Sequence, residues 1–296
     1  MRTFHLTIWS ALLISGLAAC GKQDVDPSST YYDQNDADIQ SYATKNNLNG
    51  KTTATGLYYV ITQANPTGKL ATRNEEVEFT YKAYNLGGAV VDSTVNGRPV
   101  YYPLGIQSIL PGLEEGLALM HEGEKSTLLL PSYLAYGNSA LNANLPAYSV
   151  VRFDVQLNRS RSEEQQIRQY IADKKLVVTD SSTTGLKIIK TVSNPTGAAL
   201  SNTSGQTVTI KYKGKQLRSA SAFDSTGTGT FDAILGQNRY VKGFEEGLSK
   251  LRVGEQATIV FPSSIGYGTT GVVTNNRYVI TPYAPLQFEL EVVSVK

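Results

Sequence analysis

The 296-residue sequence contains one cysteine, one tryptophan, two methionines and two histidines. A single cysteine excludes a disulfide framework within the chain and any zinc site built from several cysteines. Two histidines leave little room for a His-rich metal site or for several histidine acid–base centres. The sequence therefore predicts neither a bound metal ion nor another cofactor.

An excess of charge of either sign is also missing. The chain has 27 Lys and Arg against 25 Asp and Glu, so its net charge is only +2. Proteins that bind nucleic acid present a basic face and usually have a high pI, so we expect no nucleic-acid partner. The apolar fraction of 41% is enough for a packed core, and the length allows one large domain or two of ordinary size.

No apolar run reaches the roughly 20 residues that a membrane-spanning helix needs. The longest run covers residues 8–19, follows Arg2 and ends just before Cys20. A short apolar segment behind a positive residue is typical of a cleaved export signal. The segment Leu17-Ala18-Ala19-Cys20-Gly21 also resembles a bacterial lipobox, in which the cysteine is acylated and becomes the mature N-terminus.

The lipobox resemblance implies a lipoprotein signal peptide at residues 1–19 and a polar linker at residues 20–33. Two or more acyl chains on Cys20 would hold the protein stably on a membrane. The expected location is the cell envelope, at the outer membrane of a Gram-negative bacterium, on its periplasmic face or its surface. A plain signal peptide followed by an incidental cysteine is the alternative.

The rest of the chain repeats itself at an offset of about 130 residues. Asn-Pro-Thr-Gly occurs at residues 65–68 and again at 194–197, and Glu-Glu-Gly-Leu occurs at 114–117 and at 245–248. Solenoid and propeller repeats are only 20–50 residues long. An offset this long therefore indicates a duplicated domain.

The two copies are expected at residues 34–159 and 160–296, and each begins with a helix. In the second copy, a serine at position 160 or 162 can open a capping box that is completed three residues later. Short strands follow, and residues 208–212 alternate between polar and apolar side chains as a half-buried strand does.

One short central helix is expected near Pro111 in the first copy and near Lys242 in the second. A proline in a first helical turn carries no penalty, because its missing N–H would be unpaired there anyway. The predicted fold class is α+β, with a curved antiparallel β-sheet wrapped on one short α-helix in each domain.

Six segments of the second copy occur in an order typical of one family. They are Val-Thr-Ile-Lys-Tyr-Lys-Gly (208–214), Ala-Phe-Asp-Ser (222–225), Phe-Asp-Ala-Ile-Leu-Gly (231–236), Gly-Phe-Glu-Glu-Gly-Leu (243–248), Pro-Ser-Ser-Ile-Gly-Tyr-Gly (262–268) and Leu-Gln-Phe-Glu-Leu (286–290). In this order they resemble the FKBP-type peptidyl-prolyl cis-trans isomerases. The resemblance spans residues 202–296, and more loosely residues 74–159.

The resemblance implies two FKBP-like domains, each with a shallow aromatic pocket for a prolyl ring. In the second domain, the residues matched to the walls, floor and polar rim are Tyr212, Phe223, Asp224, Phe231, Phe244, Tyr267 and Phe288. Val241 matches the residue whose backbone N–H bonds the substrate carbonyl, and Tyr240 and Ile280 match flanking apolar contacts.

The first domain carries the same positions with less aromatic character. Its matching residues are Tyr81, Val91, Asp92, Val100, Ile109, Leu110, Leu113, Tyr136, Leu145 and Phe153. Three positions that are aromatic in the second domain are aliphatic here, namely Val91, Val100 and Leu113. Gly214 of the second domain also has no obvious counterpart after Tyr81. We therefore expect a degenerate pocket in the first domain and an intact one in the second.

The resemblance predicts an enzyme that isomerises X–Pro bonds and assists the folding of exported proteins, anchored to the envelope by Cys20. A non-catalytic FKBP-like binding or chaperone scaffold stays open, as does an envelope protein with only a surface role. The oligomeric state is open as well. The glutamate pairs at 114–115 and 245–246 are expected on a solvated face near a helix N-terminus, because adjacent residues on a helix do not face each other.

Overall fold

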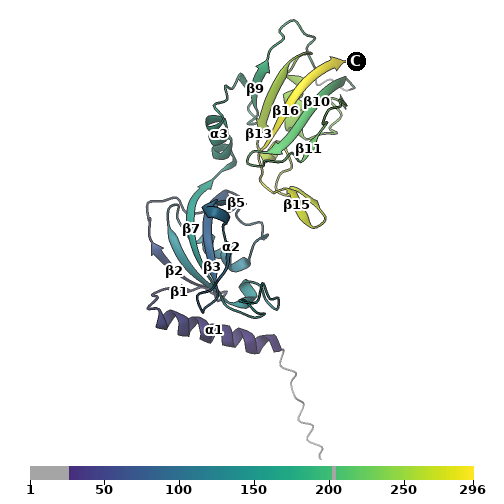
Figure 1. Cartoon of the computed structure of the whole chain (residues 1–296). Helices are drawn as coiled ribbons and strands as arrows, with labels where there is room; N and C mark the ends of the chain where they lie inside the picture. Colours follow the sequence, from purple (N-terminus) through teal and green to yellow (C-terminus); the bar gives the residue numbers. More distant parts are fainter. Residues whose placement is uncertain (1–26, 202–204) are drawn as a thin grey trace, which may run out of the picture.

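The computed structural model describes residues 27–201 and 205–296. These residues form two β-rich domains that follow one another in space as they do along the chain (Figure 1). The expected signal peptide, the expected acylation site Cys20 and the first part of the expected linker lie outside the described residues. Within the described part of the chain, no helix combines the length and the apolar character that crossing a bilayer requires.

The first domain is a seven-stranded antiparallel sheet with the order β1-β2-β6-β7-β3-β4, in which β5 also pairs with β3. Its strands are β1 (Lys51–Thr52), β2 (Tyr58–Gln63), β3 (Glu76–Tyr84), β4 (Val90–Ser93), β5 (Val100–Pro103), β6 (Lys125–Leu130) and β7 (Val151–Arg161). Helix α2 (Pro111–Ala118) packs Leu113 and Leu117 into the core on one face of this sheet. Two 3-10 turns, η1 (Val95–Gly97) and η2 (Ser132–Leu134), lie in its loops.

The second domain repeats this plan with the strand order β11-β10-β16-β13-β9-β8, and β12 also pairs with β10. Its strands are β8 (Asp180–Ser181), β9 (Lys187–Val192), β10 (Thr207–Gln216), β11 (Asp224–Ser225), β12 (Phe231–Ile234), β13 (Gln256–Phe261) and β16 (Leu286–Val295). Helix α4 (Lys242–Ser249) packs on its core, and η3 (Ser263–Ile265) follows β13. A separate hairpin of β14 (Val272–Thr274) and β15 (Arg277–Ile280) extends towards the first domain (Figure 1).

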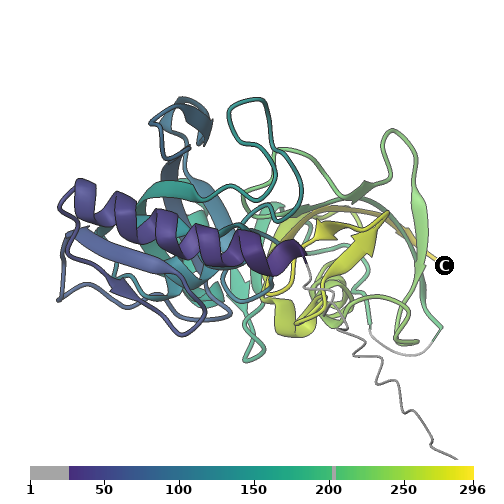
Figure 2. The ribbon, with the colours of Figure 1, turned by 90° about the horizontal axis from the view of Figure 1, so that it is seen from below.

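A second helix covers the opposite face of each sheet. Helix α1 (Pro27–Lys45) crosses the first sheet (Figure 2), and α3 (Glu163–Asp173) packs on the second. In β6, Leu128 and Leu130 point into the core with α2, while Leu129 contacts the cluster around Ile39 of α1. This alternation follows from the two-residue period of a strand. Because both faces are covered at this end of the strand, residues 128–130 form an unbroken apolar run.

The predicted α+β class and the duplication are confirmed, and the structure moves two boundaries. Strand β7 continues to Arg161, so the expected division between residues 159 and 160 falls inside a strand. Ser162 then caps α3 in a capping box with Gln165. Helix α1 begins at Pro27, within the segment expected as linker, where Tyr31 stacks on Tyr148 at 4.1 Å between ring centroids.

Candidate active site

Seven aromatic side chains of the second domain gather where α4 meets β10, β12 and β16. This group, which we call the aromatic cluster, consists of Tyr212, Phe223, Phe231, Tyr240, Phe244, Tyr267 and Phe288. The ring centroids of neighbouring members lie 5.1–6.4 Å apart, in T-shaped or tilted arrangements. These are the favoured geometries of aromatic pairs. The structure thus brings together every aromatic side chain that the sequence assigned to this site.

The aromatic cluster has a buried floor and an open rim. Phe244 and Phe288 are only 4% and 5% exposed, whereas Phe231 is 37% exposed. Phe261, which the sequence did not indicate, lies beneath the floor and stacks on Phe288 with 5.8 Å between centroids. The two-residue period of β13, which points Phe261 and Ile259 into the same core, was the only available signal for it.

A hydrogen bond places polar groups at the rim. The hydroxyl of Tyr212 donates to Oδ2 of Asp224 at 2.7 Å, and Asp224 is exposed. Burial of Tyr212, and next the Asp224 carboxylate, raise the pKa of the Tyr212 hydroxyl far above its usual range. Burial and the same carboxylate also raise the pKa of Tyr267. Both hydroxyls therefore stay protonated at the rim of the cluster.

Gly214 allows two of the rings to approach the strand. A Cβ atom at this position would lie 2.7 Å from ring atoms of both Phe223 and Phe288, closer than real side chains come. Gly214 pairs with Phe288 and Asp224, and Ala83 holds the equivalent register opposite Phe153 and Asp92. Ala83 is therefore the counterpart that the sequence alone left unidentified. Val91 stands in the first domain where the second has the larger Phe223, so one of the two rings that crowd Gly214 has no counterpart beside Ala83.

Two further residues assigned to the site occupy its margins. Val241 is the N-cap of α4, and its carbonyl accepts from the N–H groups of Phe244 at 3.0 Å and Glu245 at 3.3 Å. Ile280 ends β15 and is 2% exposed within the same core. The backbone of Val241 is thereby held at the base of the helix, next to the floor of the cluster.

The first domain keeps the polar pair and loses aromatic walls. The hydroxyl of Tyr81 donates to Oδ2 of Asp92 at 2.8 Å, and the Tyr81 and Phe153 ring centroids are 5.4 Å apart. The remaining matched residues pack on this core as aliphatic or half-buried side chains: Val91, Val100, Ile109, Leu110, Leu113, Tyr136 and Leu145. The contacts that enclose a ring in the second domain are therefore reduced here.

The prediction that the paired glutamates form a solvated face is wrong for the first member of each pair. Glu114 is buried and accepts from the backbone N–H of Gly105 and from the Tyr102 hydroxyl at 3.2 Å. Glu245, at the equivalent place in α4, is 5% exposed. In α2 the preceding loop covers the first turn, because the backbone N–H groups of Gly105 and Gln107 point at Glu114.

The chemistry available at the aromatic cluster is that of binding an apolar ring. Its floor supplies apolar surface, and its rim supplies the Asp224 carboxylate and the tyrosine hydroxyls. Across residues 27–201 and 205–296, no three His, Cys, Asp or Glu side chains are grouped so that they could hold a metal ion.

Comparison with known proteins matches both domains to one family. The family model described as FKBP-type peptidyl-prolyl cis-trans isomerase matches residues 68–158 and 200–293. Peptidyl-prolyl cis-trans isomerase FKBP9 of Rattus norvegicus is 29% identical over 220 residues, which are 73% of this chain and 34% of that protein. The probable isomerase FkpA of Neisseria meningitidis serogroup B is 38% identical over 108 residues, 36% of this chain and 39% of that protein. The chain thus spans little more than a third of these relatives.

Solved structures with a similar chain path include multi-domain and bacterial proteins. The three FKBP domains of wheat FKBP73 align with 82% of this chain and 96% of that chain, at 18% identity and a TM-score of 0.38. FkpA from Escherichia coli aligns with 45% of this chain and 62% of that chain, at 28% identity and a TM-score of 0.38.

Proposed function

This chain belongs to the FKBP-type peptidyl-prolyl cis-trans isomerase family, and on that premise we propose that its second domain isomerises X–Pro peptide bonds in protein substrates. One observation carries the proposal most strongly. The aromatic cluster is complete in the second domain, with a buried floor at Phe244 and Phe288 and the Tyr212–Asp224 hydrogen bond at its rim.

The reaction is a rotation, so it neither makes nor breaks a covalent bond. An X–Pro amide resists rotation because resonance gives its C–N bond partial double-bond character. Uncatalysed exchange takes tens to hundreds of seconds and can limit folding. In the twisted transition state resonance is lost and the carbonyl oxygen carries less charge. Surroundings that are apolar therefore favour the twisted amide over the planar one.

Different residues of the second domain would bind the prolyl ring, bind the substrate carbonyl and form the polar rim. The floor formed by Phe244 and Phe288 would receive the prolyl ring, since aromatic side chains offer large apolar area. The backbone N–H of Val241 would donate a hydrogen bond to the substrate carbonyl. The protonated Tyr212 hydroxyl holds Asp224 at the rim. There the carboxylate would face the amide that rotates.

The first domain would bind substrate more weakly and serve mainly as a spacer and holding surface. Its Tyr81–Asp92 bond is intact, but Val91, Val100 and Leu113 stand where the second domain has phenylalanines. This replacement favours the second candidate function, a non-catalytic binding or chaperone scaffold, for the first domain.

We place the protein at the cell envelope, where it would assist the folding of exported proteins. The motivation is the sequence around Cys20, the only cysteine of the chain, which follows an apolar export-type segment. Metabolic labelling with a palmitate analogue tests this assignment. We expect label on the wild-type chain and none on a Cys20→Ala variant, and an unlabelled wild-type chain would contradict it.

A proline-limited refolding assay tests the isomerase function on the chain from residue 20 onward. We expect acceleration by the wild type, loss of acceleration in Phe223→Ala, and retention in the matched variant Val91→Ala of the first domain. No acceleration by the wild type, while a control isomerase is active, would contradict the proposal. Suppression of aggregation by an inactive Phe223→Ala variant would support the scaffold function.

A further inference from the structure

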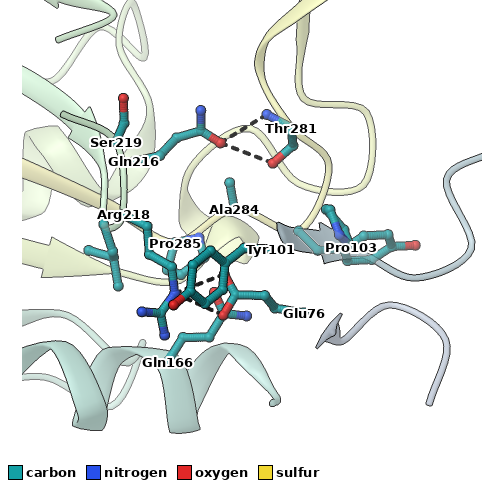
Figure 3. Close-up of a pocket in the computed structure, with 12 residues that line it drawn as sticks. Glu76, Tyr101, Pro103, Gln166, Gln216, Arg218, Ser219, Thr281, Ala284 and Pro285 are labelled. Atoms are coloured by element: carbon teal, nitrogen blue, oxygen red, sulfur yellow. Dashed lines mark hydrogen bonds and ion pairs between the residues drawn. The ribbon is translucent and has the colours of Figure 1, made fainter. Parts of the chain in front are cut away.

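The two domains are joined by a side-chain contact centred on Arg218. This residue belongs to the loop at 217–223, which follows β10 and leads to Phe223 of the aromatic cluster. Its Nε lies 3.0 and 3.2 Å from the two carboxylate oxygens of Glu76, at the start of β3 in the first domain. Its guanidinium also lies over the ring of Tyr101 on β5, 4.4 Å from the centroid. Figure 3 shows these three residues together.

The side chains of the first domain that contact Arg218 also contact a second arginine. Arg161, at the end of β7, has its Nε 3.5 Å from Glu76 and its guanidinium 5.7 Å from the Tyr101 centroid. The Glu76 side chain is only 13% exposed, and Arg161 also pairs with Glu78. A largely buried carboxylate that loses one of its partners destabilises the folded state. Arg218 therefore completes an ion-pair group that the first domain has only in part.

The C-terminal end of β10 also contacts a second loop that borders the proline site, the loop that begins at Thr281. Gln216 ends β10, and its Oε1 accepts from the N–H of Thr281 at 3.1 Å and from the Thr281 hydroxyl at 3.0 Å. Its Nε2 donates to the carbonyl of Val279 at 3.1 Å. These bonds bracket Ile280, the apolar residue assigned to the margin of the site. Gln216 and Arg218 thus connect the loop at 217–223 and the segment around Thr281 to the same end of β10.

Both loops also face the first domain across a cavity of about 270 Å³ (Figure 3). The second domain lines it with Leu217 and Ser219 of one loop and with Thr281, Tyr283, Ala284 and Pro285 of the other. The first domain closes it with Glu76, Tyr101 and Pro103, and α3 contributes Gln166. No residue of the aromatic cluster lines this cavity, so the cavity is separate from the cluster, and part of its wall comes from the loops that border the cluster.

We propose that the first domain regulates the proline site of the second by holding these two loops through Arg218, an inference that rests on the isomerase function proposed above. Arg218 is a positioning residue, because it acts through the loop that carries Phe223 and leads into Asp224 of β11. Ordering a binding loop in advance lowers the entropic cost of binding. The contact is thus expected to lower KM and to leave kcat nearly unchanged.

Kinetics of the full chain with a proline-containing peptide test the proposal. We expect Arg218→Ala to lower kcat/KM about fivefold, at the small end of allosteric coupling, through KM. The double variant Glu76→Gln/Tyr101→Ala, which alters only the first domain, should cause the same loss. Combining all three changes should add nothing, because residues of one network are not additive. Arg168→Ala, which removes an exposed arginine paired with Glu164 on α3, is the matched control and should leave KM unchanged.

Amide hydrogen exchange supplies a readout that does not depend on activity. Exchange should rise at 217–223 and 281–285 in Arg218→Ala and stay at the wild-type rate in Arg168→Ala. An inactive wild type would contradict the isomerase function, and raised exchange would then still support the contact between the domains. An active wild type whose KM is unchanged in Arg218→Ala would overturn the proposed regulation, whatever the exchange rates are.

Discussion

The hydroxyl of Tyr212 donates to the carboxylate of Asp224 at 2.7 Å, from strand β10 to its paired strand β11. Replacing Tyr212 by Phe removes the donor but keeps the ring, so it isolates the role of this bond. We expect kcat/KM to fall about tenfold, the size of effect typical of a hydrogen bond to a charged group. Tyr81→Phe, which breaks the equivalent bond in the first domain, should leave the activity unchanged. Equal losses in both variants would contradict the assignment of activity to the second domain.

The raised pKa of Tyr212 predicts how activity responds to alkaline pH. Burial and the neighbouring carboxylate both disfavour the phenolate, so the folded site keeps the proton where a free tyrosine would lose it. We expect kcat/KM to stay level as the pH rises from 7 through about 10, the ordinary pKa of tyrosine. Circular dichroism at each pH checks that the chain remains folded. A decline centred near pH 10 in the wild type that is absent in Tyr212→Phe would contradict this prediction.

The close approach of two rings to Gly214 predicts a strong effect of a single methyl group. Gly214→Ala should displace Phe223 or Phe288, since the new Cβ would lie 2.7 Å from each ring. Overpacking of this kind costs about 1–3 kcal/mol of stability. The rate of catalysed refolding should fall by at least the factor that corresponds to this free energy. The reciprocal change in the first domain, Ala83→Gly, should cost no more than about 1 kcal/mol and spare activity. Unchanged activity in Gly214→Ala would show that ring placement does not limit the reaction.

Two buried carboxylates at equivalent turns predict a loss of stability in acid. Burial alone would raise the pKa values of Glu124 and Glu255, but hydrogen bonds outweigh it and lower both below the ordinary 4.5. The main donors are backbone N–H groups for Glu124, and the Lys190 side chain followed by backbone N–H groups for Glu255. Lys190 adds an ion pair to Glu255 at 2.8 Å. The folded pKa values lie below the unfolded ones. The stability that these carboxylates confer is therefore present above about pH 4.5 and is lost as the pH falls through the folded values.

Urea unfolding of the full chain measures this effect. Glu255→Gln should lower the free energy of unfolding by about 2 kcal/mol at pH 7, and the difference from the wild type should shrink as the pH falls below 4.5. The exposed Glu164 on α3 provides the control, and Glu164→Gln should change stability at neither pH. A difference that stays constant from pH 7 to acid would mean that the charge of Glu255 does not contribute.

Local sequence patterns were sufficient for the fold class, and the resemblance to the FKBP family supplied the membership of the aromatic cluster. Residues 208–212 alternate in character, and they lie in the central strand β10 that carries Tyr212. Burial of Glu114 was not predictable in this way, because it depends on the loop that covers the first turn of α2. The start of α1 at Pro27 was missed for a similar reason. Its polar composition hides the stacking of Tyr31 on Tyr148, a residue far along the chain.

Spacing along the chain, repeated twice, was therefore enough to recognise two related domains. The family resemblance then pointed to an aromatic set that is complete in one domain and reduced in the other. The contact between the domains has no such local signature. Arg218 and Glu76 are 142 residues apart, and neither belongs to a motif. Their pairing depends on how two independently patterned sheets dock, because the carboxylate of Glu76 gains its second guanidinium only when the loop after β10 reaches the first domain.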